Sequence, residues 1–263
     1  MKILFLYDKK ENVLKEAVIE IRNLSAKYGE KVVLHDISTD FNKGEIRVIL
    51  GTSGCGKTTL LKHTIGLNKP FGGSVKIFGT RIGELDEPDT TAVLKRIGVM
   101  YQNGALLGSL TVAQNVALPL KMHSKLNDKI IEEIVRQKLK DVRMSHAYNL
   151  FPGELSGGMR KRAAIARALV LDPPILFCDE PSAGLDPVTS AGLDALLIEM
   201  RDRLGITIVV VTHEIESIKT IADSIIYLEK GFVCFDGSLK DGLALTEGKV
   251  YDFFNRIDRE ENK

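Results

Sequence analysis

The feature that most constrains the fold is a glycine-rich segment that follows a short apolar run. Residues 51–58 read Gly-Thr-Ser-Gly-Cys-Gly-Lys-Thr, which fits the pattern G-x-x-x-x-G-K followed by Ser or Thr. Residues 46–50 before it have the composition of a buried strand, and residues 59–65 after it are compatible with a helix. A strand, a glycine loop and a helix in this order predict a loop whose backbone N–H groups surround the phosphates of a nucleotide.

The residues of this loop have expected parts in holding a nucleoside triphosphate. Lys57 should reach the β- and γ-phosphates, and the hydroxyl of Thr58 should bind Mg²⁺. Cys55 is expected to be a packing residue, with a redox switch as the alternative. A chance glycine-rich turn is the alternative for the whole segment. The predicted ATP-binding residues of the loop are Gly51, Thr52, Ser53, Gly54, Cys55, Gly56, Lys57, Thr58 and Thr59.

A pair of acids, Asp179 and Glu180, directly follows a second buried strand that we predict at residues 175–178. The carboxyl ends of parallel strands share one edge of a sheet, so we expect Asp179 beside the phosphate loop of a neighbouring strand. Asp179 is predicted to hold Mg²⁺, directly or through water. Glu180 is predicted to orient and polarise the attacking water. The alternative is that both acids cap the turn at Pro181.

Two further polar residues follow apolar strands. His213 follows the continuous apolar run 206–211, which is typical of a central parallel strand and should neighbour the strand that ends at Asp179. Its ring is predicted to contact a γ-phosphate oxygen, while a plain surface histidine is the alternative. Gln102 follows the run 97–101 and is predicted to bind Mg²⁺ or the attacking water.

Composition and charge argue against several other classes. The net charge of +1 argues neither for nor against nucleic acid, but the 263 residues carry no basic stripe, so we expect no nucleic-acid partner. The three cysteines lack metal-ligand spacing, which indicates a reducing compartment. No cleavable signal is recognised, and the longest strongly apolar stretch, 206–211, is much shorter than the roughly 18 residues of a membrane-spanning helix. If the protein works at a membrane, we expect other chains to provide the membrane part.

The apolar pattern predicts one α/β domain with a helical insertion. Residues 128–142 carry apolar side chains at helical spacing, and a closing hairpin is expected around Lys230-Gly231. Short strand-like runs in the first part of the chain are residues 18–21, 32–34, 46–50, 75–78 and 97–101. The expected parts are an extension at 1–16, a domain at 17–243 with helices inserted at about 104–165, and a tail at 244–263.

In chain order, these segments resemble the nucleotide-binding subunits of ABC transporters. The order is phosphate loop, Gln102, Leu-Ser-Gly-Gly at 155–158, Asp179-Glu180, Ser-Ala-Gly-Leu-Asp at 182–186, and His213. The resemblance covers about residues 17–240. It implies the α/β fold of a P-loop NTPase, with a RecA-like core, an N-terminal antiparallel β subdomain and an inserted α-helical subdomain. It also implies an ATP hydrolase that uses ATP and Mg²⁺.

The resemblance implies a site that two copies of the chain share, head to tail. ATP would lie between the phosphate loop of one copy and a signature segment of the other. Ser156 suits the N-cap of a helix that begins at Gly157, so that the free N–H groups of this helix would face a γ-phosphate. The predicted signature residues are Leu155, Ser156, Gly157, Gly158 and Met159.

Two more residues match positions of the family. Tyr28 matches the aromatic residue that stacks on adenine, with a core tyrosine as the alternative. Asp186 matches the interface aspartate that couples the two sites of the dimer. Asp186 also suits the N-cap of a helix that has Pro187 at its first position, and the two roles are compatible.

Residues 155–168 resemble the ATPases of MCE-type phospholipid transport systems, the Mla system of Gram-negative bacteria being one. Residue 159 is Met where Gln is usual in the wider family, and this change leaves the glycine N–H groups in place. Residues 102–106 and 110–120 are similar to the same group. The alternatives are a transporter of amino acids, lipoproteins or drugs, and a soluble ABC ATPase that acts on DNA or ribosomes.

This second resemblance implies partners and a location. The partners are a second copy of the chain, transmembrane permease subunits and an MCE protein. The location is the cytoplasmic face of the inner membrane, which the chain contacts only through its partners. Residues 105–110 are expected to meet the permease coupling helix or to pack in the helical subdomain. Phe253 and Phe254 are expected to pack on the domain or on a partner.

Overall fold

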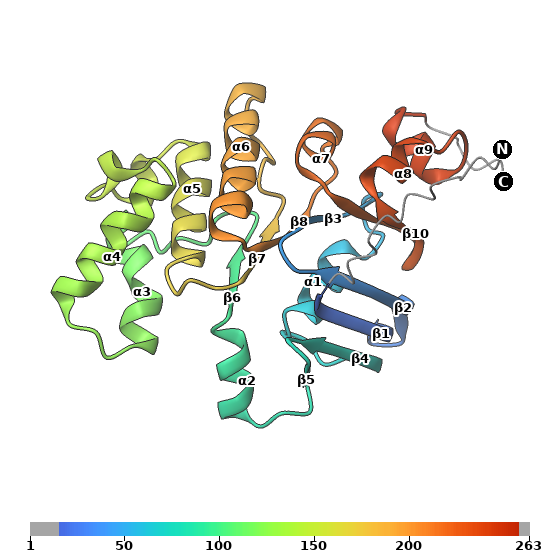
Figure 1. Ribbon diagram of the computed structural model, residues 1–263, viewed down its shortest axis with the longest axis horizontal. Coiled ribbons are helices and arrows are strands. Elements are labelled where there is room, and N and C mark those ends of the chain that lie inside the picture. Colours follow the sequence, from blue (N-terminus) through green and yellow to red (C-terminus); the bar gives the residue numbers. More distant parts are fainter. Residues whose placement is uncertain (1–15, 258–263) are drawn as a thin grey trace, which may run out of the picture.

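The computed structural model describes residues 16–257, which form two β-sheets with helices packed around them (Figure 1). The predicted N-terminal extension lies outside the described residues except for Glu16, and so does the last part of the predicted tail, residues 258–263. No helix within residues 16–257 is long and apolar enough to cross a membrane.

The first sheet is antiparallel, with the strand order β2-β1-β4-β5, and it confirms the predicted N-terminal β subdomain. Its strands are β1 (Ala17–Tyr28), β2 (Lys31–Asn42), β4 (Gly72–Ile77) and β5 (Thr80–Ile82). The sequence predicts only residues 18–21 of β1 and 32–34 of β2, whereas each strand has twelve residues. One face of this sheet is open to water, so polar residues alternate with buried ones and break up the apolar runs.

The second sheet is the core of the nucleotide-binding fold, with the strand order β10-β9-β3-β8-β7-β6. All neighbouring strands are parallel except β9 and β10, which form the predicted hairpin. The strands are β3 (Ile46–Gly51), β6 (Ile97–Met100), β7 (Ile175–Asp179), β8 (Thr207–Val211), β9 (Ser224–Glu229) and β10 (Phe232–Ser238).

Strand β3 is buried over its whole length because the sheet is covered on both faces. Ile46, Val48 and Leu50 belong to one hydrophobic cluster, which includes the helical subdomain. Ile49 points to the opposite face and packs in a second cluster with the antiparallel sheet. This double burial explains why the sequence of the strand is continuously apolar rather than alternating.

The helices surround the central sheet. They are α1 (Lys57–Thr64), α2 (Glu87–Leu94), α3 (Val112–His123), α4 (Asp128–Asp141), α5 (Gly157–Ala168), α6 (Pro187–Leu204), α7 (Ile215–Ile221), α8 (Leu239–Leu243) and α9 (Lys249–Phe254), with short 3₁₀ turns at Ser145–Ala147 and Pro152–Glu154. Helices α3, α4 and α5 pack on one another and form the predicted helical subdomain, drawn in green to yellow in Figure 1.

The segment predicted as a tail from residue 244 includes helix α9, which packs on the domain. Phe254 is buried, and the ring of Phe253 meets the ring of Tyr227 edge-on at 5.7 Å between centroids. Tyr227 lies on β9, so this helix is attached to the hairpin edge of the central sheet. Of the two expectations for the phenylalanines, packing on the chain's own domain is the one observed.

Candidate active site

The glycine loop leaves β3 through a turn in which a side chain has no room. Gly51 has φ +147°, and a Cβ there would lie 2.1 Å from the carbonyl oxygen of Leu228 and 2.8 Å from Sγ of Cys55. Gly54 and Gly56 also have positive φ, +76° and +110°. Glycine adopts these conformations without steric cost, so the loop can turn its successive N–H groups toward one centre.

Lys57 is the first residue of α1, and its ammonium lies over the loop. Its Nζ donates hydrogen bonds to the carbonyl oxygens of Gly51 at 2.8 Å and of Thr52 at 2.9 Å. The first turn of α1 has no acidic residue and no side-chain cap, so its N-terminal N–H groups remain available to an anion. Thr52, Ser53, Gly54 and Thr58 are exposed, and Thr59 is half-buried.

Cys55 is buried beneath the loop rather than presented to a ligand. Burial raises the pKa of its thiol, and the charge of Lys57 lowers it by a smaller amount. A thiol kept protonated in this way is a poor nucleophile, so its surroundings are those of a packing residue.

The hairpin between β9 and β10 supports the loop from behind. The N–H of Gly231 donates to the carbonyl oxygen of Cys55 at 3.0 Å, and the N–H of His35 donates to the carbonyl oxygen of Gly231 at 2.9 Å. Gly231 has φ +84°, and a Cβ there would lie 2.2 Å from the carbonyl oxygen of Val33. Gly231 was predicted only as part of a hairpin, and its contact with the phosphate loop has no local sequence signal.

Asp179 and Glu180 lie at the carboxyl end of β7, but β7 is not the direct neighbour of the phosphate-loop strand. Strand β8 lies between β7 and β3. The expectation that Asp179 follows a direct neighbour of the phosphate-loop strand is therefore wrong, because β7 is the second strand from β3. Burial raises the pKa of Asp179, as does the charge of Glu180, while Lys161, Lys62 and Lys57 lower it.

The carboxylate of Glu180 is held on one side and free on the other. Its side chain is 13% exposed, and Oε1 lies 2.9 Å from Nδ1 of His213. Oε2 is buried and has no hydrogen-bond partner within residues 16–257. A buried carboxylate oxygen is normally stabilised by a hydrogen-bond donor, and a water molecule can donate the hydrogen bond that Oε2 lacks.

His213 follows β8, which pairs with β7 as predicted. Its side chain is 63% exposed, and its one described hydrogen bond is with Glu180. Gln102, two residues after β6, is exposed. The predicted catalytic residues therefore come from the ends of three adjacent strands, β6, β7 and β8.

Lys161 is a buried residue of this region that was not predicted to have a role. Its Nζ donates hydrogen bonds to the main-chain oxygen of Gln102 and, at 2.9 Å, to that of Glu180. A second cation of the same helix, Arg167, donates to the carbonyl oxygens of Gly104 at 2.8 Å and Ala105 at 2.7 Å. Lys161 falls within the predicted helical run after the signature segment, but helical periodicity does not reveal such contacts with distant carbonyls.

The signature segment begins α5, as predicted. Oγ of Ser156 accepts a hydrogen bond from the N–H of Met159 at 3.3 Å, which is the expected N-cap. A Cβ at Gly158 would lie 2.4 Å from the side chain of Thr189 on α6, so a larger residue would push the two helices apart. Helix α5 is separated from α1 in Figure 1, so the signature segment and the phosphate loop of one chain lie apart.

Asp186 caps the neighbouring helix α6, which has Pro187 at its first position. Its Oδ1 accepts hydrogen bonds from the N–H groups of Val188 at 3.1 Å and Thr189 at 3.0 Å. Hydrogen bonding from the side chain of Thr189, and to a smaller extent from its N–H, lowers the pKa of this carboxyl group. The expected capping role of Asp186 is confirmed.

Tyr28 lies at the end of β1 with 51% of its surface exposed, so it is not a core tyrosine. Its hydroxyl accepts a hydrogen bond from Nδ2 of Asn68 at 3.3 Å. The exposed ring is therefore available to a planar ligand.

Together, these features define the class of the protein. A glycine loop ends a central parallel strand, a lysine begins the following helix, and an acidic pair ends a strand of the same sheet. This arrangement is that of a P-loop nucleotide hydrolase. The family model of the ABC transporter matches residues 34–183, which is more than half of the chain. The chain belongs to the ABC transporter family, as an ATP-binding and ATP-hydrolysing subunit.

Curated relatives agree on the family and differ in cargo. The chain is 40% identical over 237 residues to "Probable ribonucleotide transport ATP-binding protein mkl" of Mycobacterium leprae, covering 90% of this chain and 68% of that protein. It is 36% identical to "Intermembrane phospholipid transport system ATP-binding protein MlaF" of Haemophilus influenzae, covering 91% of each. It is 37% identical to "Methionine import ATP-binding protein MetN" of Campylobacter jejuni, covering 92% of this chain and 76% of that protein.

Solved structures share the fold. The chain is similar to cbiO1 of Clostridium perfringens, part of the ABC transporter complex cbiONQ, with a TM-score of 0.81 and 30% identity over 88% of this chain and 92% of that one. It is also similar to the ATP-binding cassette MJ0796, solved as a dimer bound to ADP and Pi. That TM-score is 0.76, with 33% identity over 84% of this chain and 98% of the other.

Proposed function

We propose that the chain is the motor of a transporter that moves phospholipid across the cell envelope, with permease subunits and an MCE protein as partners. The observation that carries the lipid assignment is the 36% identity to MlaF over 91% of both chains. The sequence Leu-Ser-Gly-Gly-Met at 155–159 supports the same assignment, because Met159 replaces the usual Gln.

In the proposed reaction, the loop binds ATP and Glu180 activates water. The N–H groups of the loop and Lys57 hold the phosphates. The free Oε2 of Glu180 accepts a hydrogen bond from the attacking water, while His213 holds Oε1 and fixes the orientation of the carboxylate. The ring of His213, whose side chain is 63% exposed, is also proposed to contact a γ-phosphate oxygen. Gln102, which follows the neighbouring strand β6, is proposed as the third catalytic residue beside Glu180 and His213.

The residues at these strand ends suit Mg²⁺, which prefers oxygen ligands. The hydroxyl of Thr58, the side-chain amide oxygen of Gln102 and the carboxylate of Asp179 are the candidate ligands, directly or through water. Burial raises the pKa of Asp179, so a cation would stabilise its charged form. When bound, Mg²⁺ neutralises charge on the phosphates.

The complete site is proposed to need two copies of the chain. Ser156, Gly157 and Gly158 begin α5 apart from the loop of their own chain, and the first N–H groups of α5 suit a phosphate supplied by a second copy. The dimeric state of the cassette MJ0796 supports this arrangement. Asp186 caps α6 beside this segment, where it is proposed to couple the two sites.

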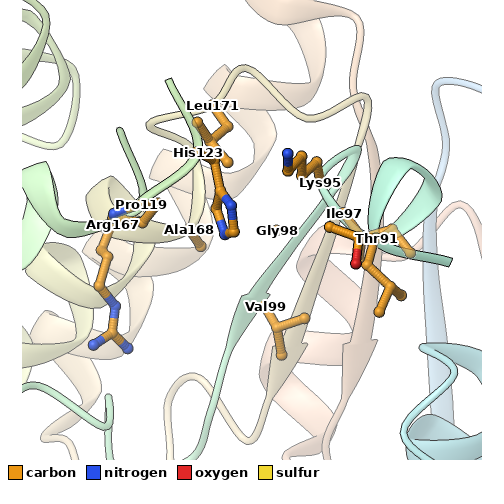
Figure 2. Close-up of a pocket in the computed structure, with 11 residues that line it drawn as sticks. Thr91, Lys95, Ile97, Gly98, Val99, Pro119, His123, Arg167, Ala168 and Leu171 are labelled. Atoms are coloured by element: carbon orange, nitrogen blue, oxygen red, sulfur yellow. The ribbon is translucent and has the colours of Figure 1, made fainter. Parts of the chain in front are cut away.

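A cavity of about 390 Å³ is the proposed docking place of the permease. It lies between α2, β6, α3 and α5, and Figure 2 shows His123 and Lys95 on either side of Gly98. Arg167 lines this cavity and donates hydrogen bonds to the carbonyl oxygens of Gly104 and Ala105, so the cavity adjoins the segment after Gln102.

Through the permease subunits the chain is proposed to act at the cytoplasmic face of the inner membrane. It is not proposed to bind nucleic acid.

Tyr28→Ala is expected to weaken ATP binding by about 5- to 150-fold, because stacking on a base contributes roughly 1–3 kcal/mol. Tyr28→Phe keeps the ring and should bind within about twofold of the wild type, since the hydroxyl bonds only Asn68 among the described residues. Titration with a fluorescent ATP analogue measures both variants. Equal affinity of the alanine variant and the wild type would exclude adenine stacking at this position.

The cargo is tested by purifying the tagged chain with its native partners from membranes. Recovery of a permease with an MCE protein and bound phospholipid is the expected result. Recovery of a solute-binding protein without lipid would instead support an amino-acid importer, the second candidate, which the 37% identity to MetN favours.

A further inference from the structure

Lys161 is a buried cation that joins two strand ends of the active site. Its side chain is on α5, and only 6% of the residue is exposed. Nζ donates to the main-chain oxygens of Gln102 and Glu180, which follow the paired strands β6 and β7. One ammonium group therefore ties the peptide after Gln102 to the peptide after Glu180.

Glu180 needs such support because its backbone conformation is unfavourable. Its φ is +46°, a left-handed conformation that is sterically unfavourable for a residue other than glycine. The N–H of Glu180 donates to the carbonyl oxygen of Val211 at 2.8 Å, and its own carbonyl oxygen accepts from Lys161 at 2.9 Å. The main chain is thus held on both sides of the residue, by β8 and by α5.

The charge of Lys161 also acts on the site. Burial lowers the pKa of its ammonium group, and the carboxylates of Glu180 and Asp179 offset part of this effect. A neutral side chain of similar length would remove the hydrogen bonds and this compensation together.

Helix α5 begins with the signature segment at Gly157, one turn before Lys161. We propose that Lys161 is a positioning residue for ATP hydrolysis, which fixes the Glu180 carboxylate and the Gln102 segment relative to the signature helix. A shift of α5 would then change the orientation of the water-activating carboxylate through the main chain of Glu180. This inference rests on the proposed catalytic role of Glu180.

The test is ATP turnover of the complete transporter that carries Lys161→Met. We expect kcat to fall by about 10- to 100-fold, because small misplacements of catalytic groups have effects of this size, while KM for ATP stays within about twofold. Lys161→Arg keeps a cation and several donors, so it should restore kcat to within about threefold of the wild type.

Arg162→Met is the matched control, because Arg162 is the next residue of the same helix and also binds two carbonyl oxygens. Its partners are Gly192 at 2.8 Å and Val142 at 3.4 Å, away from the site. Both Arg162→Met and Lys161→Met should lower the melting temperature, because each removes a side chain that binds two carbonyl oxygens, but Arg162→Met should leave kcat unchanged. If Lys161→Met does not fold, Lys161→Gln takes its place, with the same expected split between kcat and KM.

Two results would overturn the inference: normal kcat in the Lys161→Met or Lys161→Gln variant, or an equal loss of kcat in Arg162→Met. Glu180→Gln is measured in the same assay to separate this inference from the proposed function. If Glu180→Gln retains turnover, the proposed catalytic role fails. If Glu180→Gln is inactive and Lys161→Met is normal, only the positioning role fails.

Discussion

Glu180→Gln is expected to reduce the ATP turnover of the assembled transporter by at least about 100-fold, the usual contribution of a positioned general base. Glutamine has nearly the shape of glutamate, but it cannot accept a proton from water. Its side chain can still bond to His213 through the oxygen now held at 2.9 Å, so the geometry of the site should persist. Binding of ATP should therefore stay within about threefold of the wild type, which separates a catalytic from a binding defect.

Release of inorganic phosphate measures this turnover, and equilibrium titration with an ATP analogue measures the binding. Glu214→Gln is the matched control, because it makes the same chemical change three residues beyond β8, at the N-cap position of α7, where the side chain makes no capping hydrogen bond. Its turnover should equal that of the wild type. Intact hydrolysis in Glu180→Gln would show that another group activates the water.

Lys57→Met is expected to weaken ATP binding by about 10- to 150-fold, since a hydrogen bond to a charged group contributes roughly 1.5–3 kcal/mol. Methionine has a similar length and removes the ammonium group that lies over the loop. The carbonyl oxygens of Gly51 and Thr52 would also lose their donor, so the loop itself should become less ordered. Hydrolysis should fall with binding, because few sites would be filled.

Lys62→Met is the control for this change of charge. Lys62 lies on the same helix α1, is exposed, and has no described hydrogen bond to the loop. Calorimetric titration with ATP should give an affinity for this variant close to that of the wild type. If Lys57→Met binds ATP equally well, the assignment of the phosphate loop is wrong.

The sequence predicts the parts of the site that depend on local patterns. The glycine loop at 51–58, the cap at Ser156 and the cap at Asp186 are each contained within one short continuous segment, and all three are found where they were expected. Buried strands such as β8 can be recognised from the sequence. Both faces of the sheet are covered at these strands, so their residues form a continuous apolar run.

Features that depend on tertiary packing were not predictable in this way. No local pattern shows that β8 lies between β7 and β3, because strand order is set by how the helices cross the sheet. The full lengths of β1 and β2 were missed because their outer faces are polar. The contacts of Lys161 with Gln102 and Glu180 join residues that are 59 and 19 positions apart in the sequence. No periodic pattern in the sequence indicates contacts of this kind.

The hydrogen bond between Gly231 and Cys55 has a consequence for the order of folding. The supporting turn of the phosphate loop is synthesised about 175 residues after the loop itself, and β3 is paired on both sides by strands, β8 and β9, that are also synthesised much later. Such long-range pairings form slowly, because a long loop must close before the contact is gained. A nascent chain that ends before Gly231 thus carries the complete nucleotide motif without the scaffold that shapes it. Competence to bind ATP is therefore expected only after the hairpin of β9 and β10 has been synthesised and has packed behind the loop.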